Sequence, residues 1–240
     1  MTHPEVKKHS LLQSIVYHLL PGILIGVFYF LARRPVENLG YPSVMSLILA
    51  IIFILIPFEL GFLLYQGKKI NGSYSLKGII SYNHPIPVWQ LILWVVFIFL
   101  LTGVIFTLLK PLEIFFQSNV FFWIPQLNSG LDGEYSKQIL IITYILFFLF
   151  AALSAPIVEE LYFRGYLLPR MKGKFGPLVH SFLFATYHVF TPWMIITRTI
   201  GLLPLVYAVK RKNIYVGIIV HILLNTIDVI AGMIFIFSMT

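Results

Sequence analysis

The stretch LIITYILFFLFAALSA (residues 140–155) runs directly into PIVEELYFRGYLLPR (residues 156–170). The first part has the composition of a membrane-spanning helix. The second part places two adjacent carboxylates, Glu159 and Glu160, and the guanidinium of Arg164 at its end. An ionisable group at membrane depth costs from about 2.5 kcal/mol upward, so such groups are rare unless they are paired or functional.

The composition of the whole chain indicates an integral membrane protein. Of 240 residues, 59% are hydrophobic and 11% charged, with a mean hydropathy of +0.90, whereas a soluble domain carries about 25% charged residues. Apolar runs of about 20 residues favour spanning helices, and the alternation of a barrel strand is absent. We therefore expect an all-α, polytopic transmembrane helix bundle that forms one domain over residues 1–240.

Seven spans can be drawn along the chain. They are residues 11–32, 43–66, 88–109, 138–159 (extendable to 171), 178–190, 193–209 and 214–237. The fifth is short enough to stop before the far side of the membrane. The connection 110–137 is long and is expected to include an interfacial stretch.

The charges of the loops predict an orientation. If the N-terminus is cytoplasmic, cytoplasmic segments hold eleven of the 17 Lys and Arg residues, the opposite side holds five, and Arg164 lies within a span. This distribution favours a cytoplasmic N-terminus. It also explains the net charge of +8 better than nucleic-acid binding does. The chain has no cysteine, which excludes a thiol nucleophile, a disulfide and a Cys-ligated metal.

The two adjacent carboxylates face different directions on a helix. Glu160 and Arg164 are four residues apart, in the order that favours an ion pair, and a neutralising pair is the simplest interpretation. Glu159 lies about 100° further round the helix and cannot share that pairing well. It therefore needs a proton or a partner elsewhere.

Two further polar groups lie in later spans. FLFATYHVF (182–190) contains His188 four residues after Phe184, and VGIIVHILLNTID (216–228) contains His221 four residues before Asn225. Taken singly, each is typical of a hydrogen-bonded structural residue. At 1.5 Å per residue, however, Glu159 and both histidines lie roughly 13 to 18 Å from the same boundary. The coincidence favours one buried site.

Two kinds of chemistry fit such a site. A carboxylate and an imidazole can activate a water molecule, while a second imidazole and an amide donate hydrogen bonds to an oxyanion. Two histidines and a glutamate can instead hold a catalytic zinc ion with an open position. The spacing leaves zinc at Glu159, His188 and His221 as an alternative.

Together these motifs resemble the CPBP family of intramembrane, metal-independent proteases, which includes the type II CAAX prenyl endopeptidases and the bacteriocin-processing or immunity proteins of the Abi group. The resemblance covers residues 155–228, and the matching motifs are EExxxR (Glu159, Glu160, Arg164), FxxxH (Phe184, His188) and HxxxN (His221, Asn225). It implies a bundle of about eight helices around a conical cavity open to the cytoplasm. The eighth helix would lie within residues 110–137.

The resemblance also implies roles for individual residues. Glu159 would be the base that activates water, assisted by His188. His221 and Asn225 would form the oxyanion hole. The pair Glu160 and Arg164 would hold the site together. No cofactor is implied.

Three functions follow as hypotheses. The first is an endopeptidase that cuts near the C-terminus of a membrane-associated peptide, such as a prenylated CAAX tail, with lipids and that peptide or protein as partners. The second is a non-catalytic immunity or scaffold protein with the same fold, and a proton-relay transporter is a weaker third. The location would be the cell membrane if the source is prokaryotic.

Glu59 is interpreted as a structural acid, and His18, His180 and Asp228 carry no functional assignment.

Overall fold

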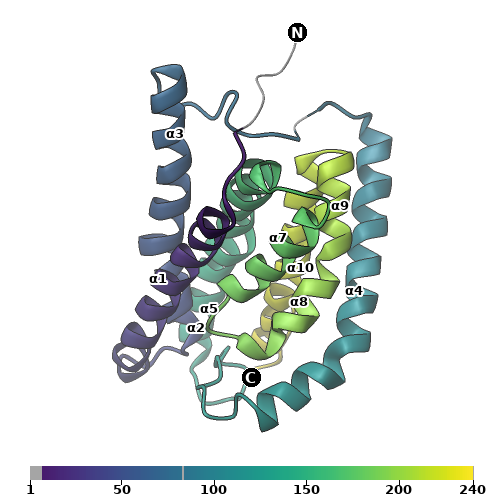
Figure 1. Ribbon diagram of the computed structural model, residues 1–240. Coiled ribbons are helices and arrows are strands. Elements are labelled where there is room, and N and C mark those ends of the chain that lie inside the picture. The colour runs from purple at the N-terminus through teal and green to yellow at the C-terminus, as the bar shows by residue number, and fades with distance from the viewer. Residues whose placement is uncertain (1–6, 83, 240) are drawn as a thin grey trace.

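The computed structural model describes residues 7–82 and 84–239, which are mostly helical and contain no strand. The elements are α1 (Leu11–Asn38), α2 (Val44–Ala50), η1 (Ile51–Leu60), α3 (Gly61–Asn71), α4 (Val88–Asn119), α5 (Lys137–Leu146), η2 (Phe147–Ser154), α6 (Ala155–Glu159), η3 (Glu160–Leu167), η4 (Leu168–Arg170), α7 (Gly176–Tyr187), η5 (Pro192–Met194), α8 (Ile195–Gly201), α9 (Leu203–Arg211) and α10 (Ile214–Ser238). They form the helical bundle expected from the composition. In Figure 1, α1 runs from the middle of the bundle to its lower left, and α10 finishes near the lower end.

Side-chain caps start three of the long helices. The Ser10 hydroxyl accepts from the Gln13 backbone N–H, and the Gln13 side chain accepts from the Ser10 N–H, which is a capping box. Ser136 and Asn213 likewise accept from backbone N–H groups at the starts of α5 and α10. Gly72 ends α3 in the left-handed conformation (φ 71°), which glycine adopts without a steric penalty.

Two of the long helices contain π-helical segments. Val44–Asn71 is one continuous apolar helix that includes η1, and Lys137–Arg170 is another that includes η2 and η3. π-Helical turns are rare and occur frequently at functional sites. In this chain they contain Glu59 in η1 and both Glu160 and Arg164 in η3, and Glu159 is the last residue of α6, directly before η3.

The number of expected spans is only partly matched. Five helices are long and apolar enough to cross a membrane, namely Leu11–Asn38, Val44–Asn71, Val88–Asn119, Lys137–Arg170 and Ile214–Ser238. Pro192–Gly201 and Leu203–Arg211, bent by 42°, add a sixth if they count as one span. With 12 residues, α7 is too short to cross a hydrocarbon core of about 30 Å. The expected seven spans are therefore not confirmed.

The expected eighth helix within residues 110–137 is wrong. Helix α4 does not stop near residue 109 but continues to Asn119, with Pro111 inside it and an ion pair of 2.6 Å between Nζ of the exposed Lys110 and Oε1 of the buried Glu113. Residues 120–136 contain no helix. In the sequence, Lys110 and Pro111 resemble the end of a span. In the structure, the salt bridge to Glu113 neutralises Lys110, and the helix accommodates Pro111.

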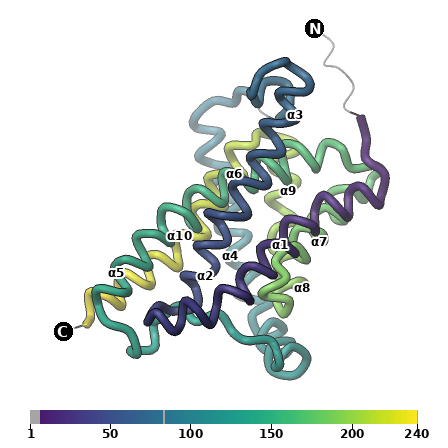
Figure 2. Tube along the Cα trace, turned by 90° about the vertical axis from the view of Figure 1, so that its left-hand side faces the viewer, coloured from purple at the N-terminus to yellow at the C-terminus, as the bar shows by residue number. Residues whose placement is uncertain are grey.

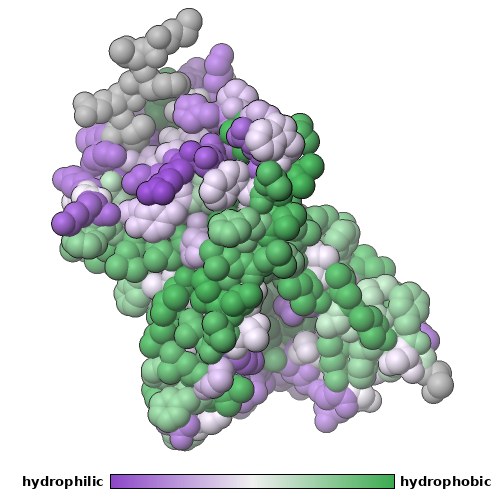
Figure 3. Space-filling model, turned by 90° about the vertical axis from the view of Figure 1, so that its right-hand side faces the viewer, coloured by the Kyte–Doolittle hydropathy of each residue, from purple (hydrophilic) through white to green (hydrophobic). Residues whose placement is uncertain are grey.

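Contacts between helices bring together the Lys137–Arg170 helix and α10, which both contain motif residues. Helix α10 packs against α4, α9 and the Lys137–Arg170 helix, and α7 packs between α1 and α8. The purple α1 and green α7 run close together in Figure 2. On the α4 side, Figure 3 shows hydrophilic residues near the two ends and an apolar surface between them. Exposed Leu93, Phe97 and Leu100 of α4 contribute to such surface, as expected for contact with lipid.

A row of small and polar residues on α1 faces α7. His18, Gly22 and Gly26 are spaced four apart, and the two glycines form a GxxxG motif of the kind that brings membrane helices into close contact. A Cβ at Gly22 would collide with the backbone carbonyl of Tyr187, and one at Gly26 with Val189 Cγ2. Helix α1 therefore touches the end of α7 on both sides of His188.

The same interface contains a buried pair of histidines. His18 Nδ1 lies 2.7 Å from the Ser14 carbonyl oxygen, so it carries the proton of that bond. His18 Nε2 then accepts from His180 Nδ1 at 2.9 Å. Both rings are fully buried. This polar contact fixes the rotation of α7 relative to α1.

The segment before α1 is attached to the end of the Lys137–Arg170 helix. The His9 backbone N–H donates to the Arg170 carbonyl at 2.9 Å, and Lys8 Nζ donates to the Pro169 carbonyl at 2.7 Å. The His9 ring lies against Tyr17. Partial burial, together with the charge of Arg170, lowers the pKa of His9 from 6.5 to about 4.

Candidate active site

The two adjacent carboxylates have different partners. Glu160 Oε1 lies 3.2 Å from a terminal nitrogen of Arg164, and both side chains are fully buried. The ion pair expected from the i, i+4 spacing is thus present. Glu160 Oε1 also lies 3.0 Å from His221 Nδ1 on α10, 61 residues further along the chain. Glu160 therefore connects the Lys137–Arg170 helix to α10.

Arg164 is held by charge and by an aromatic face. Its Cζ lies 3.7 Å from the centroid of the Phe184 ring, a close cation–π contact. The guanidinium nitrogens have no aligned hydrogen-bond acceptor among the described residues, so the Glu160 contact acts mainly as an ion pair. Phe184 also meets the rings of His188 and His221, with centroids 5.0 and 6.2 Å away. The phenylalanine of the FxxxH motif is the common wall of the site.

Glu159 faces the other nitrogen of the same histidine. Its Oε2 lies 3.6 Å from His221 Nε2, which is longer than a direct hydrogen bond. A water molecule beside the pair could hydrogen-bond to both atoms. The Glu159 and His221 side chains keep 7% and 10% of their surface exposed, whereas Glu160 and Arg164 keep none. Glu159 is thus the carboxylate that a reactant can reach.

His188 caps the C-terminus of α7, where the helix ends at Tyr187. Its Nδ1 lies 3.0 Å from the Phe184 carbonyl oxygen, which places the proton on Nδ1 and leaves Nε2 as a free acceptor in the neutral ring. Arg198, His221 and Arg164 all lie within electrostatic reach of it. No direct hydrogen bond joins His188 to Glu159 in the described part of the chain.

Asn225 lies one helical turn beyond His221 on α10. Its amide nitrogen donates to the Ala151 carbonyl in η2 at 2.9 Å. One N–H is therefore used to join two helices, which is the structural role weighed from the sequence, and the second N–H remains for another acceptor. The side chain is half-buried.

Two residues outside the motifs join the site. The Tyr187 hydroxyl donates to Glu59 Oε1 at 2.9 Å, and Glu159 lies beside the same hydroxyl. Glu59 is fully buried. Sequence reasoning interpreted it as structural because it matches no motif. An unpaired acid in the middle of an apolar span was the signal that could have identified it.

A cation also approaches the site from α8. The Arg198 guanidinium donates to Thr191 Oγ1 at 2.7 Å, and the Thr191 N–H donates to the His188 carbonyl at 3.0 Å. Glu113 and Glu159 lie within electrostatic reach of Arg198. No carboxylate comes within ion-pair distance of it among the described residues. The position of Arg198 beside His188 depends on the loop after α7 and was not predicted from the sequence.

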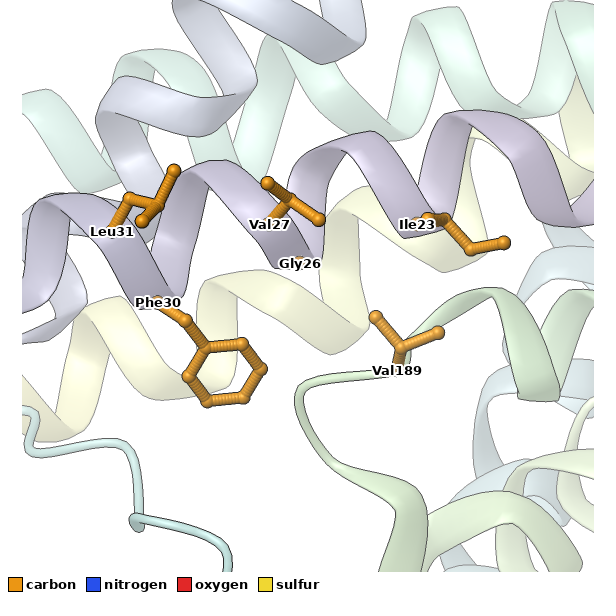
Figure 4. A pocket seen from close by; sticks show the side chains of 6 residues that line it. All are labelled: Ile23, Gly26, Val27, Phe30, Leu31 and Val189. Atoms are coloured by element: carbon orange, nitrogen blue, oxygen red, sulfur yellow. The ribbon is translucent and has the colours of Figure 1, made fainter.

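An apolar groove of about 440 Å³ borders the site on the α1 side. It is lined by Ile23, Gly26, Val27, Phe30, Leu31 and Val189, and Figure 4 shows Val189 facing α1 across it. The groove lies next to His188 on the outer surface of the bundle. The conical cavity implied by the resemblance stays a prediction.

The zinc alternative does not fit this geometry. Among the described residues, no group of three or more His, Asp or Glu side chains is arranged to hold a metal ion. His221 directs one ring nitrogen to Glu160 and the other to Glu159, and His188 makes no direct contact with either carboxylate. No step below uses a metal.

The comparison with protein families agrees with this region of the chain. Residues 141–227 match the Rce1-like family, described as type II CAAX prenyl endopeptidase Rce1-like. The match spans a little over a third of the 240 residues and contains every motif residue, which confirms the resemblance predicted from the motifs. No curated protein and no solved structure matches the chain significantly.

The Rce1-like match supports a protease at the level of the family. The five long apolar helices indicate an integral membrane protein, and the matched region is similar to a family of CAAX-type proteases.

Proposed function

We propose that this protein is an intramembrane endopeptidase that hydrolyses a peptide bond near the C-terminus of a membrane-associated peptide, without a covalent intermediate. The observation that carries the proposal is the different pairing of Glu159 and Glu160. Glu160 is neutralised by Arg164, whereas Glu159 keeps some exposed surface and faces a histidine beyond direct hydrogen-bond distance. The Rce1-like match over the same residues supports this reaction class.

Glu159 and His188 activate the water in this proposal. A carboxylate within hydrogen-bond reach of a water can take its proton as the hydroxyl attacks the scissile carbonyl, and then return it to the leaving amine. The bond to the Phe184 carbonyl keeps His188 Nε2 available as an acceptor, which suits it to orient the same water. The chemistry is proton transfer and addition of water to a carbonyl.

His221 and Asn225 stabilise the oxyanion. Because Nδ1 of His221 points at Glu160, donation to an oxyanion must come from Nε2, and this requires the doubly protonated ring. A carboxylate beside each ring nitrogen balances the charge of that form. Asn225 contributes its second side-chain N–H, because the first donates to the Ala151 carbonyl. Donors preorganised in this way are often the largest single contribution to catalysis.

The substrate class follows from the family and the setting. We propose a membrane-associated peptide or protein, such as one with a prenylated CAAX tail, that reaches the site within the bilayer and among its lipids. The site would open to the cytoplasm, with the N-terminus on that side, in the cell membrane if the source is prokaryotic. Nucleic acid is not a partner in this proposal, and the protein's own residues carry the reaction.

The test is cleavage of a farnesylated CAAX peptide by the purified, reconstituted protein. The parent is expected to release the C-terminal tripeptide, Glu159→Gln to lose cleavage, and a chelator to have no effect. Glu37→Gln is the matched control, since Glu37 pairs with Arg33 at the end of α1, away from the site. Retained cleavage by Glu159→Gln would refute the proposed role of this carboxylate.

A second candidate is a non-catalytic immunity or scaffold protein. The bond from Asn225 to Ala151 favours it, because it shows a motif residue acting as a contact between helices. Under this alternative Glu159→Gln lowers the melting temperature and no peptide is cleaved. Under the protease proposal the same variant melts like the parent.

A further inference from the structure

A carboxyl group that belongs to none of the motifs lies behind the proposed base. Glu59 is in η1, close to the middle of the Val44–Asn71 helix, and has no exposed surface. Its Oε1 accepts a hydrogen bond from the Tyr187 hydroxyl, and its Oε2 has no partner among the described residues. A buried acid with half of its acceptor capacity unused is costly unless it holds a proton or exchanges one.

Tyr187 lies between this carboxyl group and Glu159. Its hydroxyl donates to Glu59 Oε1 at 2.9 Å and also interacts with Glu159, which lies beside it. The phenol has one proton to give, so its lone pairs face Glu159 in this arrangement. Glu159 satisfies those lone pairs only when its oxygen on that side carries a proton. If Glu59 carries the proton instead, the phenol can donate to an ionised Glu159.

The surrounding charges leave the two acids to share their protons. Arg164 acts on both acids, but its ion pair is with Glu160. The other charged or titratable groups that act on Glu159 are His221, Glu160 and Arg198. Tyr162 is the remaining titratable neighbour of Glu59. Two close carboxylates in a site without bulk water do not both stay ionised, and such a pair titrates as one unit.

We propose that Glu59 is a positioning residue that exchanges one proton with Glu159 through Tyr187, and so sets whether Glu159 is ionised and available as the base. The step balances in protons and involves no oxidation. The Glu159 O–H donates to the Tyr187 oxygen while the Tyr187 O–H passes to Glu59 Oε1. Glu159 becomes a carboxylate, Tyr187 stays neutral, and Glu59 becomes a carboxylic acid. The reverse transfer returns the proton.

The exchange lets the proposed reaction begin with the form of Glu159 that it needs. The attack of water needs an ionised Glu159, which Glu59 permits by holding the proton. Departure of the amine uses the proton that Glu159 has taken from the water. This inference rests on the proposed function for its consequence in catalysis, whereas the shared proton is argued from the Glu59–Tyr187 hydrogen bond and the neighbouring Glu159.

The kinetic test uses Glu59→Gln, Tyr187→Phe and the double variant with a cleavable peptide. General acid–base groups contribute about 10²–10⁴-fold, and a residue acting through the base is expected to carry about tenfold of this. Each single variant should lower kcat about tenfold with KM unchanged, and the double variant should lose no more than the worse single one. Glu113→Gln, also a buried acid, is the control and should keep parental kcat.

Two kinetic results would overturn the inference. One is parental kcat in Glu59→Gln. The other is losses that multiply in the double variant, because independent structural roles add in free energy whereas a shared chain does not. Melting temperatures are measured in parallel. If Glu59→Gln does not fold, Tyr187→Phe alone must still lower kcat at unchanged KM.

A spectroscopic test needs no substrate and separates this inference from the proposed function. The infrared spectrum of the parent should contain the carbonyl stretch of a buried protonated carboxyl group. Glu59→Gln or Glu159→Gln should remove or shift it, Tyr187→Phe should shift it by removing a hydrogen bond, and Glu113→Gln should leave it unchanged. A band that none of the three site variants alters, or no band, refutes the shared proton. If no peptide is cleaved but the band responds, only the proposed function fails.

Discussion

Glu160 pairs with Arg164 and Glu159 does not. Substitution by glutamine should therefore lower the stability of the protein at Glu160 and leave it almost unchanged at Glu159. Glu160→Gln keeps the size of the side chain but leaves Arg164 as a buried cation without a counter-charge. At the 3.2 Å separation and an effective dielectric constant of about 20, the lost attraction is about 5 kcal/mol. Breaking one partner of a buried pair costs about 3–5 kcal/mol in practice, which agrees.

The assay is thermal unfolding in detergent, followed by the fluorescence of the four tryptophans, because the chain has no cysteine for thiol-reactive dyes. For a domain of this size, a loss of 1 kcal/mol lowers the melting temperature by about 2–4 °C, so Glu160→Gln should melt about 10 °C below the parent. Glu159→Gln should stay within about 2 °C, because its contact with His221 is longer than a hydrogen bond.

A double variant separates charge from shape. Glu160→Gln combined with Arg164→Met removes both charges and should recover most of the lost stability, because a buried pair can often be replaced by apolar side chains at little cost. Equal losses in Glu159→Gln and Glu160→Gln, or no recovery in the double variant, would refute the assignment of Glu160 to architecture and Glu159 to chemistry.

Three further expectations can be checked independently. Gly22→Ala should lower the melting temperature and cleavage together by pushing the end of α7 away, whereas Gly103→Ala, where a Cβ meets nothing within 4 Å, should cost nothing in a melting assay; equal effects contradict the tight crossing. His9 has its pKa lowered to about 4, so the unfolded state binds more protons as the pH falls from about 6.5 to 4 and stability should decrease over that window. Melting curves of His9→Phe should lack this pH-dependent loss of stability. A parent whose melting temperature stays constant over that pH window would contradict the expectation. Single cysteines at Ser73 and Ser129 should react with an impermeant maleimide from opposite sides, Ser73 from the cytoplasm, and reaction of both from one side overturns the topology.

Residues close in sequence were the ones whose contacts could be predicted. The pair Glu160 and Arg164 follows from helix periodicity alone, and the observed 3.2 Å contact reflects it. The common depth of Glu159, His188 and His221 follows from counting residues to the basic loops. Both inferences need only the rise and twist of one helix at a time.

Contacts between helices could not be obtained in this way. The bond from His221 Nδ1 to Glu160 depends on how α10 rotates against the long helix, a packing property of many side chains. The place of Glu59 beside Tyr187 depends likewise on how η1 packs against its neighbours α1 and α6. The length of α4 was underestimated because Lys110 and Pro111 look like a terminus until Glu113 is seen to neutralise the lysine.

The glycine crossing between α1 and α7 links the proposed chemistry to the bilayer. Helix α1 has 28 residues, about 42 Å at 1.5 Å per residue, which exceeds a hydrocarbon thickness of about 30 Å and requires tilt or exposed ends. Its contact with the Tyr187 carbonyl is backbone against backbone, with no flexible side chain to absorb movement. A thinner membrane that tilts α1 further must therefore carry the phenol and imidazole at the end of α7 along with it. The lipid composition of the membrane thereby becomes a variable of the reaction, alongside the peptide and the pH.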